Sequence, residues 1–375
     1  IVHSEASMGW GGQEHRVLAE LKGFQDRGGW VALLAPEKSV IFQRARDAGI
    51  QTRHLDTKKI RYPINAFRLK RWLRENEAQV VNTHSSRDGY LVGAAARLAR
   101  TPLLIRSRHI DVTYPNRWAS RHAFTSLADH VVTTSQKITK HLRETFRLGE
   151  NRVSTVPTGI DLDAFQPDGP KAEFFEGQSK GADGPALVGM VSVLRSWKGH
   201  PIFLEAARLL KDRGVKARFI IVGEGPQREN INATIAELGL QPGEDVTLAG
   251  HREDVPAVLR ALDALAIPST GHEGVPQIGL QALATKTPII GSDAGGIPEI
   301  VRPGETGRIV AAGDAKELAA AIEAALTKTD ETRRFSENGR QLVEREHSLD
   351  HMLDRLEEIY SRRLNAGQPS PSTID

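Results

Sequence analysis

The sequence contains no cysteine, so disulfide bonds and thiolate metal sites are excluded, and no oxidising compartment is indicated. It also lacks an apolar run long enough to cross a bilayer, and its start, Ile1-Val2-His3, lacks the charged and apolar regions of a signal peptide. We therefore expect a cytoplasmic protein. At 375 residues the chain exceeds one typical hydrophobic core, which predicts two domains.

Charge is nearly balanced overall but unevenly distributed along the chain. The net formal charge is +3, yet residues 1–160 carry +12 and the remainder carries −9. A basic first half indicates either contact with an anionic partner or attraction between the two halves of the chain. The sequence favours neither interpretation over the other.

Strand patterns alternate with helical patterns along both halves of the chain. In the first half, strands are predicted at 30–36, 79–84, 102–109 and 130–135, and helices at 13–28, 64–77, 86–100 and 116–128. In the second half, strands are predicted at 186–193, 217–223, 246–250, 264–268 and 288–292. Because strands that are apolar on both faces are covered by helices, each half is predicted to be a doubly wound, Rossmann-like α/β domain.

The domain boundaries are predicted from composition. The N-terminal domain spans 1–170, the polar and glycine-rich segment 171–184 is a linker, and the C-terminal domain spans 185–348. The last helix, 349–365, is expected to pack back on the N-terminal domain, and 366–375 is predicted to be a disordered tail. Ligands of such sheets bind beyond the carboxyl ends of the strands, so the cleft between the domains is the predicted site.

Two loops after predicted strands have the composition of anion-binding sites. The first, Gly9-Trp10-Gly11-Gly12-Gln13-Glu14, opens a helix whose N–H groups favour phosphate, although a simple glycine turn is the alternative and GxGxxG is not matched. The second, Leu194-Arg195-Ser196-Trp197-Lys198-Gly199, places two cations after strand 186–193. These cations are predicted to clamp a diphosphate, with solvated surface charges as the alternative.

A third loop, Gly271-His272-Glu273-Gly274-Val275-Pro276-Gln277, is predicted to open a helix that runs to Lys286. Glu273 lies between glycines beyond strand 264–268, and Gln281 eight residues later is expected to share its helix face. A helix-capping carboxylate is the alternative interpretation. The HExxH zinc motif is excluded because Gln277 stands where its second histidine would be.

Taken in order, these segments resemble the large retaining GT-B glycosyltransferase group called family 4, over nearly the whole chain. The resemblance also rests on Pro157-Thr158-Gly159-Ile160-Asp161, Gly223-Glu224-Gly225-Pro226 and Gly296-Ile297-Pro298-Glu299. It is greatest to bacterial members that build lipopolysaccharide and other envelope glycans. The resemblance implies two Rossmann-like domains that face each other across a cleft, the N-terminal one binding the acceptor and the C-terminal one the nucleotide sugar.

The resemblance assigns catalytic roles by position. Glu273 would hydrogen-bond hydroxyls of the donor sugar, Lys198 would bind the diphosphate, and His109 would approach the sugar. The group's usual arginine is replaced by Val193, so Arg195 is our candidate for its role. A core or surface histidine is the alternative interpretation of His109.

The resemblance also implies a nucleotide-binding set without a metal. Gln281 stands where the group usually has a glutamate for the ribose hydroxyls, so it can bond them but brings no charge. The other implied donor-binding residues are Gly11, Gly12, Gly223, Gly225, His251, Arg252, Gly274, Val275 and Pro276. No metal or other cofactor is expected, and Asp161-Leu162-Asp163 is interpreted as the domain crossover rather than a DxD metal motif.

The resulting hypothesis is a retaining glycosyltransferase that uses a UDP-sugar, or alternatively a GDP-sugar. Its acceptor would be an envelope glycan or a lipid-linked acceptor, with lipopolysaccharide core favoured. Two alternatives remain open. A nucleotide-sugar 2-epimerase would convert the donor without any acceptor, and a non-catalytic nucleotide-sugar-binding protein is suggested by Val193 and Gln281.

Basic stretches in the first half predict where an acceptor or membrane would bind. They are Lys58-Lys59-Ile60-Arg61-Tyr62-Pro63 and the group Arg68, Lys70, Arg71 and Arg74. We expect contact with anionic lipid head groups, at the inner face of the cytoplasmic membrane, or with a phosphorylated oligosaccharide. A solvated helix whose Leu69, Trp72 and Leu73 pack on the sheet is the alternative. Nucleic acid is not expected, because no binding motif is present.

Overall fold

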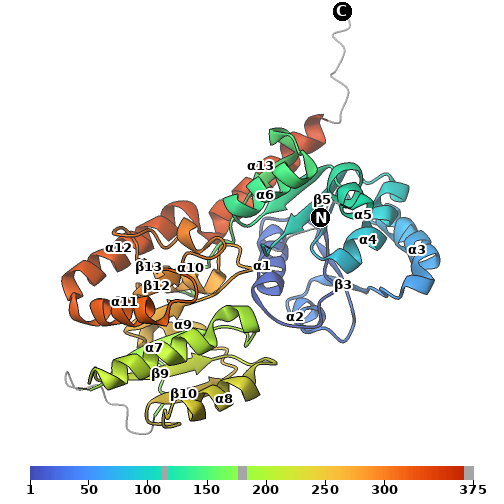
Figure 1. Cartoon of the computed structure of the whole chain (residues 1–375). Helices are drawn as coiled ribbons and strands as arrows, with labels where there is room; N and C mark the ends of the chain where they lie inside the picture. The colour runs from blue at the N-terminus through green and yellow to red at the C-terminus, as the bar shows by residue number, and fades with distance from the viewer. Residues whose placement is uncertain (112–116, 176–183, 367–375) are drawn as a thin grey trace, which may run out of the picture. The chain divides into compact units, whose positions relative to one another are not determined.

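The computed structural model describes residues 1–111, 117–175 and 184–366. Most of the predicted linker and nearly all of the predicted tail lie outside the described residues. The chain divides into unit 1, Ile1–Gly159 with Leu349–Asp375, and unit 2, Ile160–Ser348 (Figure 1). The structure therefore divides the chain after Gly159, whereas the composition placed the first boundary at residue 170.

Unit 1 contains a parallel sheet of seven strands in the order β3-β2-β1-β4-β5-β6-β7. Its strands are β1 (Val2–Ser4), β2 (Ala32–Ala35), β3 (Gln51–His54), β4 (Val80–Thr83), β5 (Leu103–Arg108), β6 (His130–Thr133) and β7 (Val153–Thr155). β1 pairs with β2 on one side and with β4 on the other, both in parallel. The strand order therefore reverses between β1 and β4.

Helices cover both faces of this sheet. They are α1 (Gly12–Asp26), α2 (Val40–Asp47), α3 (Tyr62–Glu75), α4 (Ser86–Ala99), α5 (Trp118–His122), α6 (Gln136–Phe146) and α13 (Leu349–Ala366). One core is formed by α1, α2 and α13 against the sheet, and another by α3 and α4. The central strands β2 and β4 are covered on both faces, so their sequences are mainly apolar rather than alternating.

The C-terminal helix α13 belongs to unit 1 because it packs on α1. Gly23 of α1 allows this close approach, since a Cβ there would lie 2.3 Å from Cδ1 of Leu353. Leu353 and Leu356 of α13 are buried in the same cluster as Leu21 and Phe24 of α1. The chain thus crosses into unit 2 after Gly159 and returns to unit 1 at Leu349.

Unit 2 repeats the architecture with a parallel sheet of six strands in the order β10-β9-β8-β11-β12-β13. Its strands are β8 (Ala186–Val191), β9 (Ala217–Val222), β10 (Val246–Gly250), β11 (Ala264–Ile267), β12 (Ile289–Ser292) and β13 (Arg308–Val310). Its helices are α7 (His200–Asp212), α8 (Arg228–Glu237), α9 (Val255–Ala261), α10 (Gln277–Ala284), α11 (Ala315–Thr327) and α12 (Thr329–Glu346). The predicted α/β class with two Rossmann-like domains is confirmed.

Strands β3, β7 and β13 were not predicted from the sequence, and the structure shows why. β3 has the sequence QTRH and is an edge strand, so it lacks the apolar run expected of a buried strand. β7 and β13 each contain three residues, too few to show a period. The helix predicted at 116–128 is α5 followed by a π-helical turn at Ala123–Leu127, and its first residue, 116, lies outside the described residues.

Candidate functional site

The strand order of unit 2 creates a topological switch point between β8 and β11. β8 and β11 are parallel neighbours in the sheet. After β8 the chain forms β9 and β10 on one side of β8, and it then crosses to form β11 on the other side. Loops that follow two such strands diverge and leave a crevice in which ligands of doubly wound sheets bind. Here the two loops carry Lys198 after β8 and Glu273 after β11.

Lys198 and Glu273 form an ion pair at this point. Nζ of Lys198 lies 2.6 Å from Oε1 of Glu273, and their side chains are 21% and 8% exposed. The hydroxyl of Ser269 donates to the same oxygen at 2.7 Å. Both donors use Oε1, so Oε2 is the carboxylate oxygen left to accept a ligand hydroxyl. A half-buried ammonium and a buried carboxylate, held in fixed geometry, suit a ligand with phosphate and hydroxyl groups.

The backbone around Glu273 is held by the loop after β12. The N–H of Gly296 donates to the carbonyl of Glu273 at 3.2 Å, and Ser292 donates to the carbonyl of Ser269 at 2.5 Å. Gly295 has φ of +58°, and a Cβ there would lie 2.3 Å from the Glu273 carbonyl oxygen. Gly295 and Ser269 are positioning residues that the sequence analysis did not include among the site residues, although it uses the adjoining Gly296-Ile297-Pro298-Glu299 for the family resemblance. The Gly-Gly pair and the Ser four residues before Glu273 were the available signals.

The structure corrects the predicted helix start. α10 begins at Gln277 with Pro276 as its N-cap, so Glu273 lies in the loop before the helix. Gln281 is half-buried in the second turn of α10. The prediction that Glu273 and Gln281 share one helix face is therefore wrong. Pro276 explains the difference, because the residue before a proline is disfavoured in helical conformation. The helix also ends at Ala284, before Lys286.

Arg195 is exposed, and its guanidinium carbon lies 5.9 Å above the ring of Trp197. Trp197 in turn contacts the Glu273 loop, because its carbonyl accepts the N–H of Thr270 at 2.8 Å and its ring meets His272 edge-on at 5.6 Å. The structure thus connects Arg195 to the Glu273 loop through Trp197. Its assignment to the diphosphate clamp stays a prediction.

Gly223 and Gly225 are required by the backbone of the loop after β8. Gly223 has φ of +135°, and a Cβ there would lie 1.9 Å from the Ser192 carbonyl oxygen. At Gly225 a Cβ would lie 2.7 Å from the backbone of Leu194, whose N–H bonds the carbonyl of Glu224 at 3.0 Å. These glycines therefore shape the wall of the switch point, which accounts for their identity without a nucleotide.

The loop after β10 carries the remaining predicted nucleotide contacts. His251 is exposed. Arg252 forms a two-point ion pair with Asp254, at 2.7 and 2.5 Å, and lies 5.6 Å from the ring of Phe174. Gly274, Val275 and Pro276 are buried in the Glu273 loop. The roles of all these residues towards a nucleotide stay predictions.

Gly199 provides a test of how tightly the two loops are packed. It has φ of +80°, and a Cβ there would lie 1.9 Å from the Pro268 carbonyl oxygen. Gly199→Ala should lower the free energy of unfolding by roughly 2–5 kcal/mol, from left-handed backbone strain plus overpacking. Gly214 is a matched control, since its φ is +73° and nothing lies within 4 Å. Gly214→Ala should cost only about 1 kcal/mol. Urea unfolding measures both, and equal losses would contradict this packing.

In unit 1 the predicted residue His109 lies in a row of three histidines. Its Nε2 lies 2.8 Å from Nδ1 of His84, and Nε2 of His84 lies 2.9 Å from Nδ1 of His3. All three are buried. Burial, with nearby cationic groups, lowers the pKa of His3 to about 3 and holds the pKa values of His84 and His109 well below their usual range. The row is therefore uncharged near neutral pH.

The glycine loop before α1 carries acidic groups of its own. Glu14 accepts the N–H of Gly11 at 2.9 Å, which occupies one amide of the predicted phosphate-binding turn. Glu5 is buried, and burial, then the neighbouring Asp88, raises its pKa to about 8. Gly12 is exposed at the first position of α1. A diphosphate contact by Gly11 and Gly12 stays a prediction, and Glu14 competes with it.

Unit 1 contains a cluster of side chains that could supply the ligands of a metal ion. Among the described residues, one group of potential ligands, His3, Glu20 and His84, has its atoms within 4.8 Å of one another. Its two histidine nitrogens are hydrogen-bonded to each other, so a metal ion would have to break that hydrogen bond.

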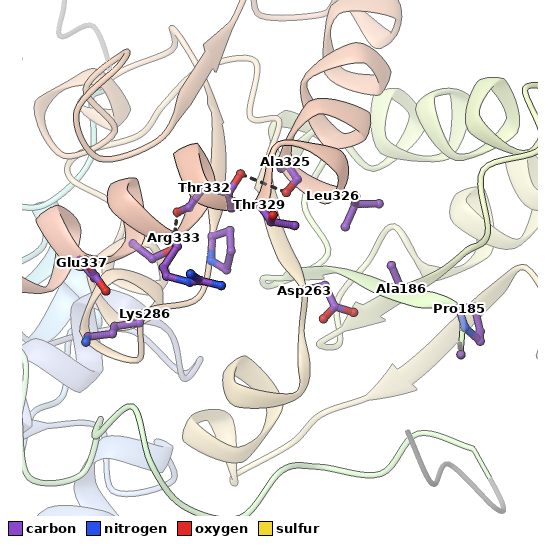
Figure 2. A pocket seen from close by; sticks show the side chains of 13 residues that line it. Pro185, Ala186, Asp263, Lys286, Ala325, Leu326, Thr329, Thr332, Arg333 and Glu337 are labelled. Atoms are coloured by element: carbon purple, nitrogen blue, oxygen red, sulfur yellow. Dashed lines mark hydrogen bonds between the residues drawn. The ribbon is translucent and has the colours of Figure 1, made fainter. Parts of the chain in front are cut away.

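A cavity of about 560 Å³ in unit 2 lies at the amino ends of the strands, beside Ala186, Asp263 and Thr332 (Figure 2). It is therefore at the edge opposite Lys198 and Glu273.

Two family models match the chain. Residues 10–164 match the model described as Glycosyltransferase Family 4, and residues 172–342 match the model described as Glycosyl transferases group 1. Together these matches span most of both units. The chain is a glycosyltransferase of the GT-B type.

Individual relatives differ in their substrates. The transferase is 28% identical over 312 residues to the alpha-D-kanosaminyltransferase of Streptomyces kanamyceticus, covering 78% of this chain and 79% of the relative. It is 24% identical over 307 residues to the Escherichia coli UDP-Gal:alpha-D-GlcNAc-diphosphoundecaprenol alpha-1,3-galactosyltransferase, covering 78% and 77%. The solved Anabaena HepE structure with UDP and glucose has a TM-score of 0.82 at 18% identity, covering 96% of this chain and 99% of that chain. This last likeness concerns the fold.

Proposed function

We propose that this transferase moves a sugar from a nucleoside diphosphate sugar, with UDP favoured, to a lipid-linked or envelope-glycan acceptor with retention of configuration. The observation that carries the proposal is the Lys198–Glu273 pair at the switch point of unit 2. A UDP donor is supported by the E. coli relative, which is a UDP-galactose-dependent transferase, and by the HepE structure, which contains UDP. The same E. coli relative acts on a diphosphoundecaprenol-linked sugar, which favours a lipid-linked acceptor over the lipopolysaccharide core.

Each charge of the pair has a chemical task in this proposal. As the bond between the anomeric carbon and the phosphate oxygen breaks, negative charge builds on the departing diphosphate, and the ammonium of Lys198 stabilises it. The carboxylate of Glu273 accepts hydrogen bonds from hydroxyls of the sugar and so fixes the orientation of the sugar. The acceptor oxygen bonds the anomeric carbon from the face that the phosphate leaves, and its proton passes to the departing phosphate oxygen.

A panel of UDP-, GDP- and ADP-sugars tests this function. We expect release of UDP that depends on a polyprenyl-diphosphate-linked sugar, and a new glycosidic bond with the donor's anomeric configuration in proton NMR. Conversion of the donor to its 2-epimer without any acceptor would instead support the epimerase. Nucleotide binding without release or conversion would support the non-catalytic alternative.

We also propose that α3 brings unit 1 to an anionic membrane surface. Ile60, Ile64 and Phe67 are 89%, 59% and 65% exposed, and their spacing places them on one side of the helical segment 59–75. The opposite side buries Leu69, Trp72 and Leu73. Cations flank the exposed group: Lys58, Lys59, Arg61, Arg68, Lys70 and Arg71. Exposed apolar side chains among cations are typical of interfacial helices. Within the described residues, no helix is long and apolar enough to span a bilayer.

Substitution of the apolar group tests this surface. The double variant Ile60→Ser/Phe67→Ser should bind phosphatidylglycerol vesicles at least about tenfold more weakly in co-sedimentation, because about 1.4 kcal/mol of apolar burial is lost. Val40→Ser on α2 is the control, since Val40 is 38% exposed on a helix that packs in the core of α1 and α13 rather than in that of α3 and α4. Wild-type binding should weaken with added salt. Equal binding by the double variant and the wild type would contradict the proposal.

A further inference from the structure

The histidine row crosses the sheet of unit 1 at its topological switch point. His3 lies in β1, His84 directly follows β4, and His109 directly follows β5. These three strands are neighbours in the sheet, so the rings stack side by side, with centroids 4.9 Å apart for His3 and His84 and 5.1 Å apart for His84 and His109. The row therefore ends at His109, beyond the carboxyl end of β5, where ligands of such sheets bind.

Two hydrogen bonds among three neutral rings permit only two proton arrangements. A neutral imidazole has one N–H and one acceptor nitrogen. In the first arrangement, His109 donates to His84 and His84 donates to His3, so the proton of His3 is on Nε2. In the second, His3 donates to His84 and His84 donates to His109, so the proton of His109 is on Nδ1. The neighbours of His3 decide between them.

Glu20 favours donation towards His109. Its Oε2 lies 3.7 Å from Nδ1 of His3, and its Oε1 accepts Nε of buried Arg16 at 2.6 Å. Arg16 keeps its proton, so Glu20 is needed as its anionic partner. A proton on Nδ1 of His3 is donated to His84, and it places the positive end of the N–H bond near this carboxylate, whereas a lone pair there would lie near negative charge.

The other ring nitrogen of His3, Nε2, also favours donation towards His109. Nε2 of His3 is buried and has no hydrogen-bond partner among the described residues. Nε2 is unpaired in both arrangements, as an N–H in one and as a lone pair in the other, and buried N–H groups without an acceptor are the rarer of the two in native structures. The arrangement that places the His3 proton on Nε2 thus leaves an N–H unpaired and also places a lone pair near Glu20. Both effects disfavour it.

We propose that Glu20, His3 and His84 are positioning residues that fix His109 as its Nδ1–H tautomer. With Nε2 of His109 occupied by His84, Nδ1 becomes the ring nitrogen that donates to a substrate oxygen, in the class of a sugar hydroxyl. The carbonyl of His109 is held by Thr134 at 3.0 Å, which anchors the residue's backbone. The catalytic consequence rests on the proposed function, but the tautomer does not.

Two isosteric substitutions of His84 test the row. In His84→Asn, the amide NH₂ takes the place of the Nδ1 donor, so His109 should keep its proton on Nδ1. In His84→Asp, a carboxylate oxygen takes that place and accepts, so His109 should carry a proton on Nε2. NMR of protein with ¹⁵N-labelled histidine reports the protonated nitrogen, and the His109→Gln variant identifies the signal. Circular dichroism and thermal unfolding confirm that each variant is folded.

The transferase activity of the variants His84→Asn and His84→Asp gives a second readout. We expect kcat/KM of His84→Asp to be at least about tenfold below that of His84→Asn, while both bind UDP equally, because nucleotide contacts are predicted in unit 2. A wild-type His109 with its proton on Nε2, or an unchanged tautomer in His84→Asp, would overturn the proposal. The predicted tautomers without any transferase activity would instead count against the proposed function. If neither His84 variant folds, the wild-type tautomer alone decides.

Discussion

Replacing Glu273 with alanine should lower kcat/KM of sugar transfer by at least about a hundredfold without unfolding the protein. The carboxylate is proposed to accept two sugar hydroxyls, and each charge-assisted hydrogen bond contributes about 1.5 kcal/mol. Its present partners, Lys198 and Ser269, lie on one oxygen and leave the other for the sugar. Initial rates over a range of donor concentrations, with circular dichroism of the variant, measure the effect.

Two further variants show whether the loss of activity comes from the charge of Glu273. Glu273→Gln keeps the size of the side chain but removes its charge, so it should also lose most activity, because Lys198 loses its anionic partner. Glu305→Ala is the control, since Glu305 is an exposed carboxylate in the same unit that pairs with Arg302 at 3.3 Å. Such a pair contributes about 1 kcal/mol at most. Wild-type turnover by folded Glu273→Ala would remove Glu273 from the site.

Removing the ammonium of Lys198 should raise the dissociation constant of the nucleoside diphosphate at least about tenfold, a loss of roughly 1.4 kcal/mol. Lys198→Ala removes the cation that faces the diphosphate in the proposed complex. It also leaves the 8%-exposed carboxylate of Glu273 unpaired, which repels phosphate. Calorimetric titration with UDP measures the change.

The control for this variant is another lysine of unit 2. Lys211 pairs with Asp245 and lies on α7, away from the switch point. Lys211→Ala should bind UDP as the wild type does. If Lys198→Ala binds UDP unchanged, the phosphate clamp does not involve Lys198, and Arg195 becomes the residue to test next.

Much of the fold could be predicted because the buried strands are continuous apolar runs. Strands such as β8 and β9 are covered on both faces, so their sequences are apolar apart from Gly189 and Arg218. β3 could not be predicted in this way, because QTRH at a sheet edge carries no apolar signal. Its pairing with β2 is set by position in the sheet, which local composition does not report.

The charged pair of the proposed donor site could be singled out from the sequence, but the residues that hold the pair in place could not. Lys198 and Glu273 stood out because each follows a buried strand, and parallel strands bring such residues to one edge. Ser269 and Gly295 act through a hydroxyl and a backbone approach, which have no distinctive spacing in the sequence. His3 and His84 are 81 residues apart, and only the β1–β4 pairing brings them together.

The proposed function depends most on where a donor binds, and a crystal structure with a 2-fluoro UDP-sugar determines this directly. We expect the diphosphate to lie within hydrogen-bonding distance of Nζ of Lys198 and the sugar hydroxyls to donate to the carboxylate of Glu273. A diphosphate bound away from the switch point between β8 and β11, with the Lys198–Glu273 pair untouched by ligand, would contradict it.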